Sequence, residues 1–187
     1  MEGHQMNPIL SLAEYAEPLL NSPYILRTRR NHGLEHATIH ILSRANYKLS
    51  GRSSDQGFII FGNVPTDRVE SAVNEALQRM QSGEHKLAVH PNCGTNLVTA
   101  GFTATVVAWL GFAGGGWRRG WERFPTMMVI MMVVLLFSKP LGMSLQRHIT
   151  TEGDPGDLRL LSVKRETLRV PFTGGQLMIH RVLTQQS

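Results

Sequence analysis

The chain has 187 residues, a formal net charge of +5 and one cysteine. This length fits one domain, or one small domain with a membrane element, and a single cysteine excludes an intrachain disulfide framework. The arginines and lysines are scattered, without a long basic run or interleaved aromatic residues, so we expect no nucleic-acid partner.

Residues 1–30 are expected to form an N-terminal helical or interfacial segment. Apolar residues recur at helical spacing from Ile9 to Leu20, and Pro8 stands where a proline can open a helix. Glu14 and Glu17 lie on the opposite side of this helix. The pattern indicates a helix that packs on the domain or lies at a membrane interface.

The run HGLEH at residues 32–36 follows. On a helix, His32 and His36 are one turn apart on the same face, where two imidazoles can bind one zinc ion. Glu35 beside the second histidine matches the inverted H-x-x-E-H order, in which the glutamate acts on a metal-bound water. A polar helix face that binds no metal would show the same pair.

Residues 31–96 predict a small α+β domain with a helix, a β-hairpin, a second helix and a short strand. The first helix carries HGLEH, with Asn31 as its N-cap and an end near residues 43–46. Two short strands, 47–49 and 58–61, should form the hairpin around a turn-rich stretch.

The second helix is the clearest soluble element of the sequence. Asp67 and Glu70 resemble a capping box at its start, and Gly83 should end it. Its core face is expected to comprise Val69, Ala72, Val73, Ala76, Leu77 and Met80. The short apolar segment 87–89 is predicted to be a strand that leads to His90.

The run HPNCGTN starts at His90 and holds the only cysteine, Cys93. Zinc prefers four ligands drawn from histidine, cysteine and carboxylate groups. His32 and His36 can supply two of them, and this loop can supply one or two more. The alternatives are a loop histidine at position 90 and a buried, inert thiol at position 93.

Residues 97–145 are predicted to form a transmembrane helical hairpin. No charged residue stands between Lys86 and Arg118, and the span 97–116 is long enough to cross the hydrocarbon layer. A loop at 117–123 leads to a second span that can extend from 124 to 145. Small residues suited to close helix contact recur in the first span: Ala100, Ala104 and Ala108. A buried helical hairpin of a soluble core is the alternative.

The C-terminal segment, residues 146–187, is expected to return to the same side as residues 31–96. A loop at 154–157 precedes a predicted last helix at 158–168, and the turn- and strand-like tail 170–183 is left unassigned. The start of the chain lacks the features of a secretory signal. We therefore expect both termini in the cytosol and the hairpin in an inner, plasma or thylakoid-type membrane.

Three short motifs in this order resemble the YqhQ-like membrane proteins, a family of metal-dependent enzymes of unknown function. The first motif, HGLEHATI, matches that family's HGAEHK, and the second, HPNCGTN, matches its HPRCGT. The third, LQRHITT with a following Asp-Pro loop, matches its LQ…TT stretch. The resemblance covers Asn31 to Leu168. The chain departs at Leu34 and Ala37, where the family has Ala and Lys, and it lacks a Gly-rich N-terminal region, which indicates a smaller sister group. The resemblance implies that Gly94 and Thr95 shape the second loop. It also implies a functional set of His32, Glu35, His36, His90 and Cys93.

Two functions are open. In a zinc-dependent membrane hydrolase, His32, His36 and one of His90 or Cys93 would hold the metal, and Glu35 would be the general base. In a membrane scaffold or assembly protein, all four ligands would close a structural zinc site. We expect the lipid bilayer as partner in both cases, together with other membrane proteins or a second copy of the chain. A haem or redox protein has little support, because the sequence has no C-x-x-C-H motif and only one cysteine.

Overall fold

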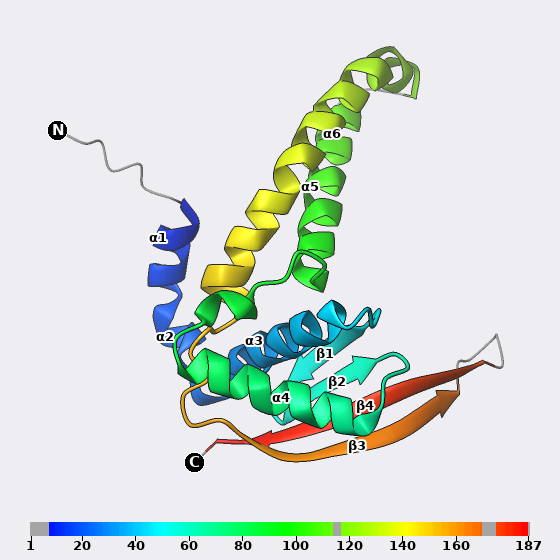
Figure 1. The fold of residues 1–187 in the computed structure, drawn as a ribbon. Coiled ribbons are helices and arrows are strands. Elements are labelled where there is room, and N and C mark those ends of the chain that lie inside the picture. Colours follow the sequence, from blue (N-terminus) through cyan, green and yellow to red (C-terminus); the bar gives the residue numbers. More distant parts are fainter. Residues whose placement is uncertain (1–7, 114–116, 170–174, 187) are drawn as a thin grey trace. The chain divides into compact units, whose positions relative to one another are not determined.

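The computed structural model describes residues 8–113, 117–169 and 175–186 (Figure 1). The chain forms two compact units. One comprises Met1–His90 with Arg147–Ser187, and the other comprises Pro91–Gln146. The helices are α1 (Pro8–Tyr15), α2 (Glu17–Leu20), α3 (Pro23–Arg44), α4 (Thr66–Gln81), the 3-10 helix η1 (His85–Ala88), α5 (Gly94–Phe112), α6 (Trp117–Leu145) and the π-helical turn η2 (Gln146–Thr150). The strands are β1 (Ser50–Ser54), β2 (Gly57–Phe61), β3 (Arg159–Arg169) and β4 (Gln176–Gln185).

The first unit combines helices with a small antiparallel sheet, which confirms the predicted α+β class. The strand order is β1-β2-β4-β3, so the C-terminal hairpin joins the N-terminal one through the β2–β4 pair. Phe58 and Ile60 of β2 stand opposite Val182 and His180 of β4, and all four side chains are buried on one face of the sheet. Helix α3 contacts β1 and β2, and α4 contacts α3 and β3. One hydrophobic core therefore joins both helices to this face.

Helix α4 confirms the sequence prediction in its core but not in its cap. All six residues of the expected apolar face are buried, and Gly83 follows the helix with a φ of 100°. The capping box is wrong: Pro65 is the N-cap and no side chain caps the helix. Thr66, at the first helical position, instead shares a hydrogen bond with Nε2 of the buried His180 at 3.3 Å.

Helix α3 starts at Pro23, so the predicted N-cap role of Asn31 is wrong. Asn31 is fully buried in the middle of the helix. Its Nδ2 donates to the carbonyl oxygens of Ser54 and Asp55 at 2.9 and 3.1 Å, and its Oδ1 accepts from Thr184 Oγ1 at 2.7 Å. This amide ties α3 to the β1–β2 turn and to β4. The predicted helix at residues 9–20 is two short helices, α1 and α2, separated at Ala16.

Three further local predictions are wrong. The first strand is Ser50–Ser54, within the expected turn, because this stretch pairs residue by residue with β2. Residues 85–88 form the 3-10 helix η1 where a strand was expected at 87–89. Residues 159–169 form β3 where a helix was expected, because they pair along their length with β4.

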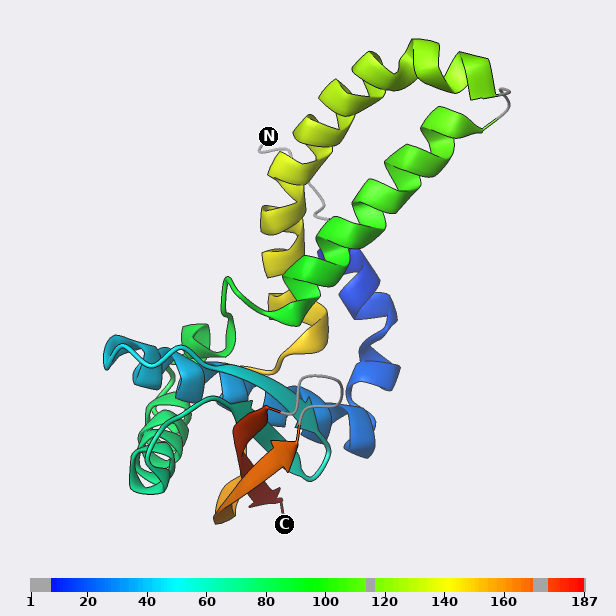
Figure 2. The same cartoon turned by 90° about the vertical axis from the view of Figure 1, so that its right-hand side faces the viewer.

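The second unit is an antiparallel pair of helices, α5 and α6 (Figures 1 and 2). Small and polar residues fill their contact: a Cβ at Gly142 would lie 3.0 Å from Cα of Asn96, and Gln146 Nε2 donates to Oδ1 of Asn96 at 2.8 Å. The predicted stripe of alanines on α5 is half-buried. Large apolar side chains such as Phe102 and Leu136 are instead exposed, at 68% and 76%.

One helix among the described residues, Trp121–Thr150, is long and apolar enough to cross a membrane. The expected loop at 117–123 is part of α6, so that prediction is wrong. The expected end of the first span at residues 114–116, and the tail at 170–174, lie outside the described residues. By length and composition, the residues that the structure describes therefore contain one candidate span where two were expected.

Candidate metal centre

Three histidines of the first unit lie side by side. His32 and His36 come from consecutive turns of α3, and their ring centroids are 4.4 Å apart. His90 follows η1 along the chain, and its ring centroid lies 6.0 Å from that of His36. Helical spacing explains the first pair. The second pair, His36 and His90, is brought together by η1, which contacts α3.

Backbone carbonyls orient the two rings on α3. Nδ1 of His36 donates to the carbonyl oxygen of Ala88 at 2.7 Å, and Nδ1 of His32 donates to that of Thr150 at 2.9 Å. A carbonyl oxygen only accepts, so each Nδ1 must carry the proton, and the neutral ring then has its lone pair on Nε2. This is the arrangement of metal-binding histidines, in which the second nitrogen is fixed by a carbonyl or carboxylate group.

The electrostatic surroundings of His90 favour its neutral form. Burial lowers its pKa, and the nearby His36 and His40 lower it further. A neutral imidazole is the form that binds metals. His40 continues the α3 line by one turn, but Arg44 Nη2 lies 3.3 Å from its Nε2. Burial and two arginines, Arg44 and Arg79, lower the pKa of His40.

Glu35 lies against β1 and is 4% exposed. Ser53 Oγ donates a hydrogen bond to its Oε2. Burial raises the pKa of the Glu35 carboxyl, while the Ser53 hydroxyl and the neighbouring His32 act in the opposite direction. No lysine or arginine of the described residues forms an ion pair with Glu35. Among the described residues, the neighbour that favours the charged form of this buried carboxyl group electrostatically is therefore His32, and not a lysine or an arginine.

Gly33 lets the Thr150 carbonyl reach His32. A Cβ at this position would lie 3.1 Å from Cβ of Ala88 and 3.3 Å from the carbonyl carbon of Glu152, so the segment 150–152 crosses α3 at close range. Arg29 holds the crossing: its carbonyl accepts from Glu152 N at 3.0 Å, and its Nη2 donates to the carbonyl of Thr151 at 3.1 Å. A glycine inside a helical motif is a sequence signal for such a close approach, and this signal was not used in the prediction.

Cys93 belongs to the second unit, where it is the N-cap of α5. Its Sγ accepts from the backbone N–H of Thr95 at 3.4 Å. Of the predicted set, the first unit brings His32, His36 and His90 together with Glu35 beside them, and Cys93 follows His90 by three residues in the chain. Ser53 and the carbonyls of Ala88 and Thr150 were not predicted from the sequence.

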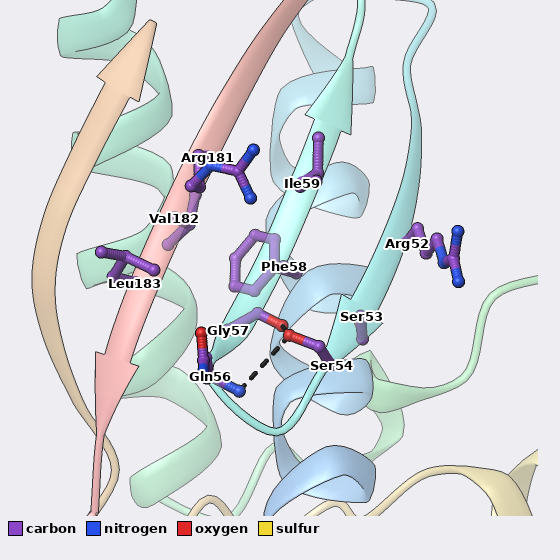
Figure 3. Close-up of a pocket in the computed structure, with 10 residues that line it drawn as sticks. All are labelled: Arg52, Ser53, Ser54, Gln56, Gly57, Phe58, Ile59, Arg181, Val182 and Leu183. Atoms are coloured by element: carbon purple, nitrogen blue, oxygen red, sulfur yellow. Dashed lines mark hydrogen bonds between the residues drawn. The ribbon is translucent and has the colours of Figure 1, made fainter. Parts of the chain in front are cut away.

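A pocket on the sheet of the first unit, lined in part by Ser53, offers no competing metal centre. It is formed by β1, β2 and β4 (Figure 3) and contains no histidine, cysteine or carboxylate side chain. Arg52 and Arg181 are its charged residues. Metal or acid–base chemistry is therefore better served by the histidine cluster.

Residues 27–163, more than half of the chain, match the model of a family described as a domain of unknown function, DUF6391. The chain belongs to this family. A relative from Picosynechococcus sp. (strain ATCC 27264 / PCC 7002 / PR-6), named only as an uncharacterized protein, is 34% identical over 161 residues, which cover 76% of this chain and 74% of the relative. No solved structure matches the chain.

The expectation of a family of unknown function is thus confirmed, but the comparisons do not support the YqhQ-like name. In this DUF6391 chain the matched range includes all of the candidate site residues: His32, Glu35, His36, His90 and Cys93. It ends inside β3 and leaves out β4, although β4 completes the sheet between β2 and β3.

Proposed function

We propose that this protein is an integral membrane protein that binds one zinc ion through His32, His36 and His90, with Cys93 as a further ligand. The observation that carries the proposal is the pair of Nδ1–carbonyl hydrogen bonds on His32 and His36. They leave the lone pairs on the Nε2 atoms of two neighbouring rings. Nitrogen and sulfur donors of this kind fit zinc.

Cys93 enters the proposal through the chain. Three residues after His90, it is at most about 10 Å from it along the backbone. A thiolate as fourth ligand would close the site, whereas three histidines alone would leave one position open. Ligand number therefore decides between a structural and a catalytic centre.

We favour a hydrolase, and the support is the buried carboxyl group of Glu35 next to His32. A zinc ion would supply a Lewis acid that polarises water. Glu35, one residue before His36 and beside His32, would accept the proton. Burial of a carboxyl group costs stability, and burial raises the pKa of Glu35, as a general base that works near neutral pH requires. The substrate would carry a bond that water can cleave, such as an ester or an amide.

The second candidate is a non-catalytic scaffold or assembly protein with a closed zinc site, favoured by the nearness of Cys93 to His90 in the chain. Glu35 would then orient a ligand. A structural zinc site contributes about 10–16 kcal/mol of apparent binding energy, enough to stabilise a unit of this size.

We further propose that α5 joins α6 as a two-helix transmembrane hairpin in an inner, plasma or thylakoid-type membrane, with both termini in the cytosol. Support comes from the distribution of residues in the helix pair, which is the opposite of that in a soluble protein. Small and polar residues line the contact between α5 and α6, and large apolar ones face outward. Its partners would be the bilayer and other membrane proteins or a second copy. The shared order of three motifs supports a sister relation to the YqhQ-like proteins.

Elemental analysis tests the metal site. We expect one zinc per chain in protein purified without chelators, and loss of that zinc in a His32→Ala/His36→Ala variant. His85→Ala is the matched control, because His85 lies exposed on η1. Metal-free wild-type protein that is folded would rule out both functions.

Glu35→Gln separates the two functions. On the hydrolase proposal, the variant still binds one zinc per chain at saturating metal but does not complement a strain that lacks the gene. Full complementation would rule out catalysis by Glu35 and favour the scaffold. Cobalt substitution adds a second readout, because thiolate ligation gives an intense charge-transfer band that should disappear in Cys93→Ser.

A further inference from the structure

Two neighbouring positions of β1 face the Glu35 carboxylate. Gly51 and Ser53 alternate with Arg52, so both point to the same side of the sheet. Their partners on β2 are Ile60 and Phe58, which face the core beneath α3. β1 therefore presents one residue without a side chain and one hydroxyl to the helix that carries the histidines.

The fit around the carboxylate is close. A Cβ at position 51 would lie 2.6 Å from Cδ and 2.8 Å from Cγ of Glu35, so only glycine leaves room for this side chain. Ser53 Oγ donates to Oε2. Glu35 is 4% exposed, so water cannot readily replace the serine. These contacts define the orientation of the carboxylate.

Glutamate needs such a contact to keep one orientation. Its terminal torsion has broad, two-fold preferences, so an unrestrained carboxylate rotates. We propose that Ser53 is a positioning residue that holds the Glu35 carboxylate beside His32 and thereby strengthens metal binding at the histidine cluster. The inference rests on the proposed zinc site. It applies to an open and to a closed site, because Glu35 adjoins the same ligands in both.

Zinc affinity of the full-length protein tests this role without a substrate. Competition with a chromogenic chelator gives the dissociation constant for wild type, Ser53→Ala, Glu35→Gln and the double variant. Partners that orient a metal site typically affect its affinity 10- to 100-fold, so we expect Ser53→Ala to weaken zinc binding about tenfold or more. Because Ser53 acts through Glu35, the serine change should have little further effect in the Glu35→Gln background.

Two variants distinguish positioning from general stability. Ser53→Thr keeps the hydroxyl on a strand residue and should restore most of the affinity. Ser54→Ala removes the neighbouring hydroxyl, which bonds within the hairpin turn to the carbonyl of Gly57, and should leave the affinity unchanged. Gly51→Ala should displace the carboxylate and weaken binding as Ser53→Ala does, which provides a test if Ser53→Ala fails to fold.

The outcomes separate the two proposals. A Ser53→Ala protein with wild-type zinc affinity would overturn the role of Ser53 while the zinc site stands. An equal loss in the wild-type and Glu35→Gln backgrounds would also overturn it, because the serine would then act independently of Glu35. Wild-type protein that takes up no zinc would overturn the metal site itself, and this role of Ser53 with it.

Discussion

Replacing Gly33 by alanine tests whether the crossing of residues 150–152 over α3 holds the metal centre together. In an exposed helix interior this change stabilises a protein by about 1 kcal/mol, because alanine has the higher helix propensity. At position 33 the new Cβ would press on the backbone of Glu152 and lie 3.1 Å from Cβ of Ala88. A backbone cannot yield as a flexible side chain does, so the segment must move.

The cost follows from the contacts that such a movement breaks. Three hydrogen bonds join the segment to α3: Glu152 N to the carbonyl of Arg29, Arg29 Nη2 to the carbonyl of Thr151, and His32 Nδ1 to the carbonyl of Thr150. Each contributes about 0.5–1.5 kcal/mol net, and overpacking adds about 1–3 kcal/mol. Even a partial loss of these hydrogen bonds, together with the overpacking, outweighs the gain in helix propensity. We therefore expect a net destabilisation of about 1–4 kcal/mol.

The assay must report on the first unit. The three tryptophans, Trp109, Trp117 and Trp121, lie in α5 and α6, so their fluorescence reports on the other unit. Hydrogen exchange of peptides from α3 and residues 147–157, with urea unfolding followed by circular dichroism, reports on the first. Ser43→Ala, at an exposed position of α3, is the control for a gain in helix propensity without a change in packing. Gly33→Ala protein as stable as this control would refute the close crossing.

Three further changes test other parts of the structure. Burial lowers the pKa of His180 below its ordinary value, so the unfolded chain takes up a proton first as the pH falls. The contribution of His180 to the free energy of unfolding is then complete above about pH 6.5 and is lost below it. The loss is at most about 1.4 kcal/mol between about pH 7.5 and 5.5. His180→Leu should reduce this pH dependence in urea unfolding, and an unchanged pH dependence would contradict the assignment. Asn31→Leu removes three buried hydrogen bonds and should lower the unfolding free energy by about 2–4 kcal/mol, whereas a loss below about 0.5 kcal/mol would show that the amide is dispensable. Gly142→Ala should speed hydrogen exchange in α6, because the new Cβ would clash with Asn96. Gly101→Ala is the control and should not, because a Cβ there has no neighbour within 4 Å. Equal exchange in the two variants would argue against the close helix contact.

The sequence predicted α4 well because its burial is periodic and local. It failed at β3, and the reason is a β-bulge between Leu160 and Ser162. The extra residue shifts the alternation of the strand, so the two side chains that pack on the core, Leu160 and Val163, stand three apart. Spacing of three is the mark of a helix. A bulge cannot be seen in one sequence, so the strand resembled an irregular helix.

The composition of residues 50–54 predicted a turn, but these residues form the strand β1, which packs against Glu35. Gly51 and Ser53 are small because Glu35 occupies the space above them. The start of α3 was missed for a related reason. Its basic residues are held by carboxylates distant in the sequence, Arg29 by Glu152 at 3.4 Å and Arg30 by Asp157 at 3.8 Å. Such tertiary contacts override local signals at functional positions.

The HGLEH motif predicted the side chains of the candidate metal centre on α3 but not the atoms that orient them. The acceptors for His36 and His32 are backbone carbonyls 52 and 118 residues away in the chain. Backbone atoms leave no signature in the residue types, so only the fold reveals them. Because both acceptors need the folded first unit, the two rings keep their orientation only in that state. A metal held there would therefore bind the native state preferentially, and by linkage its binding would stabilise the fold.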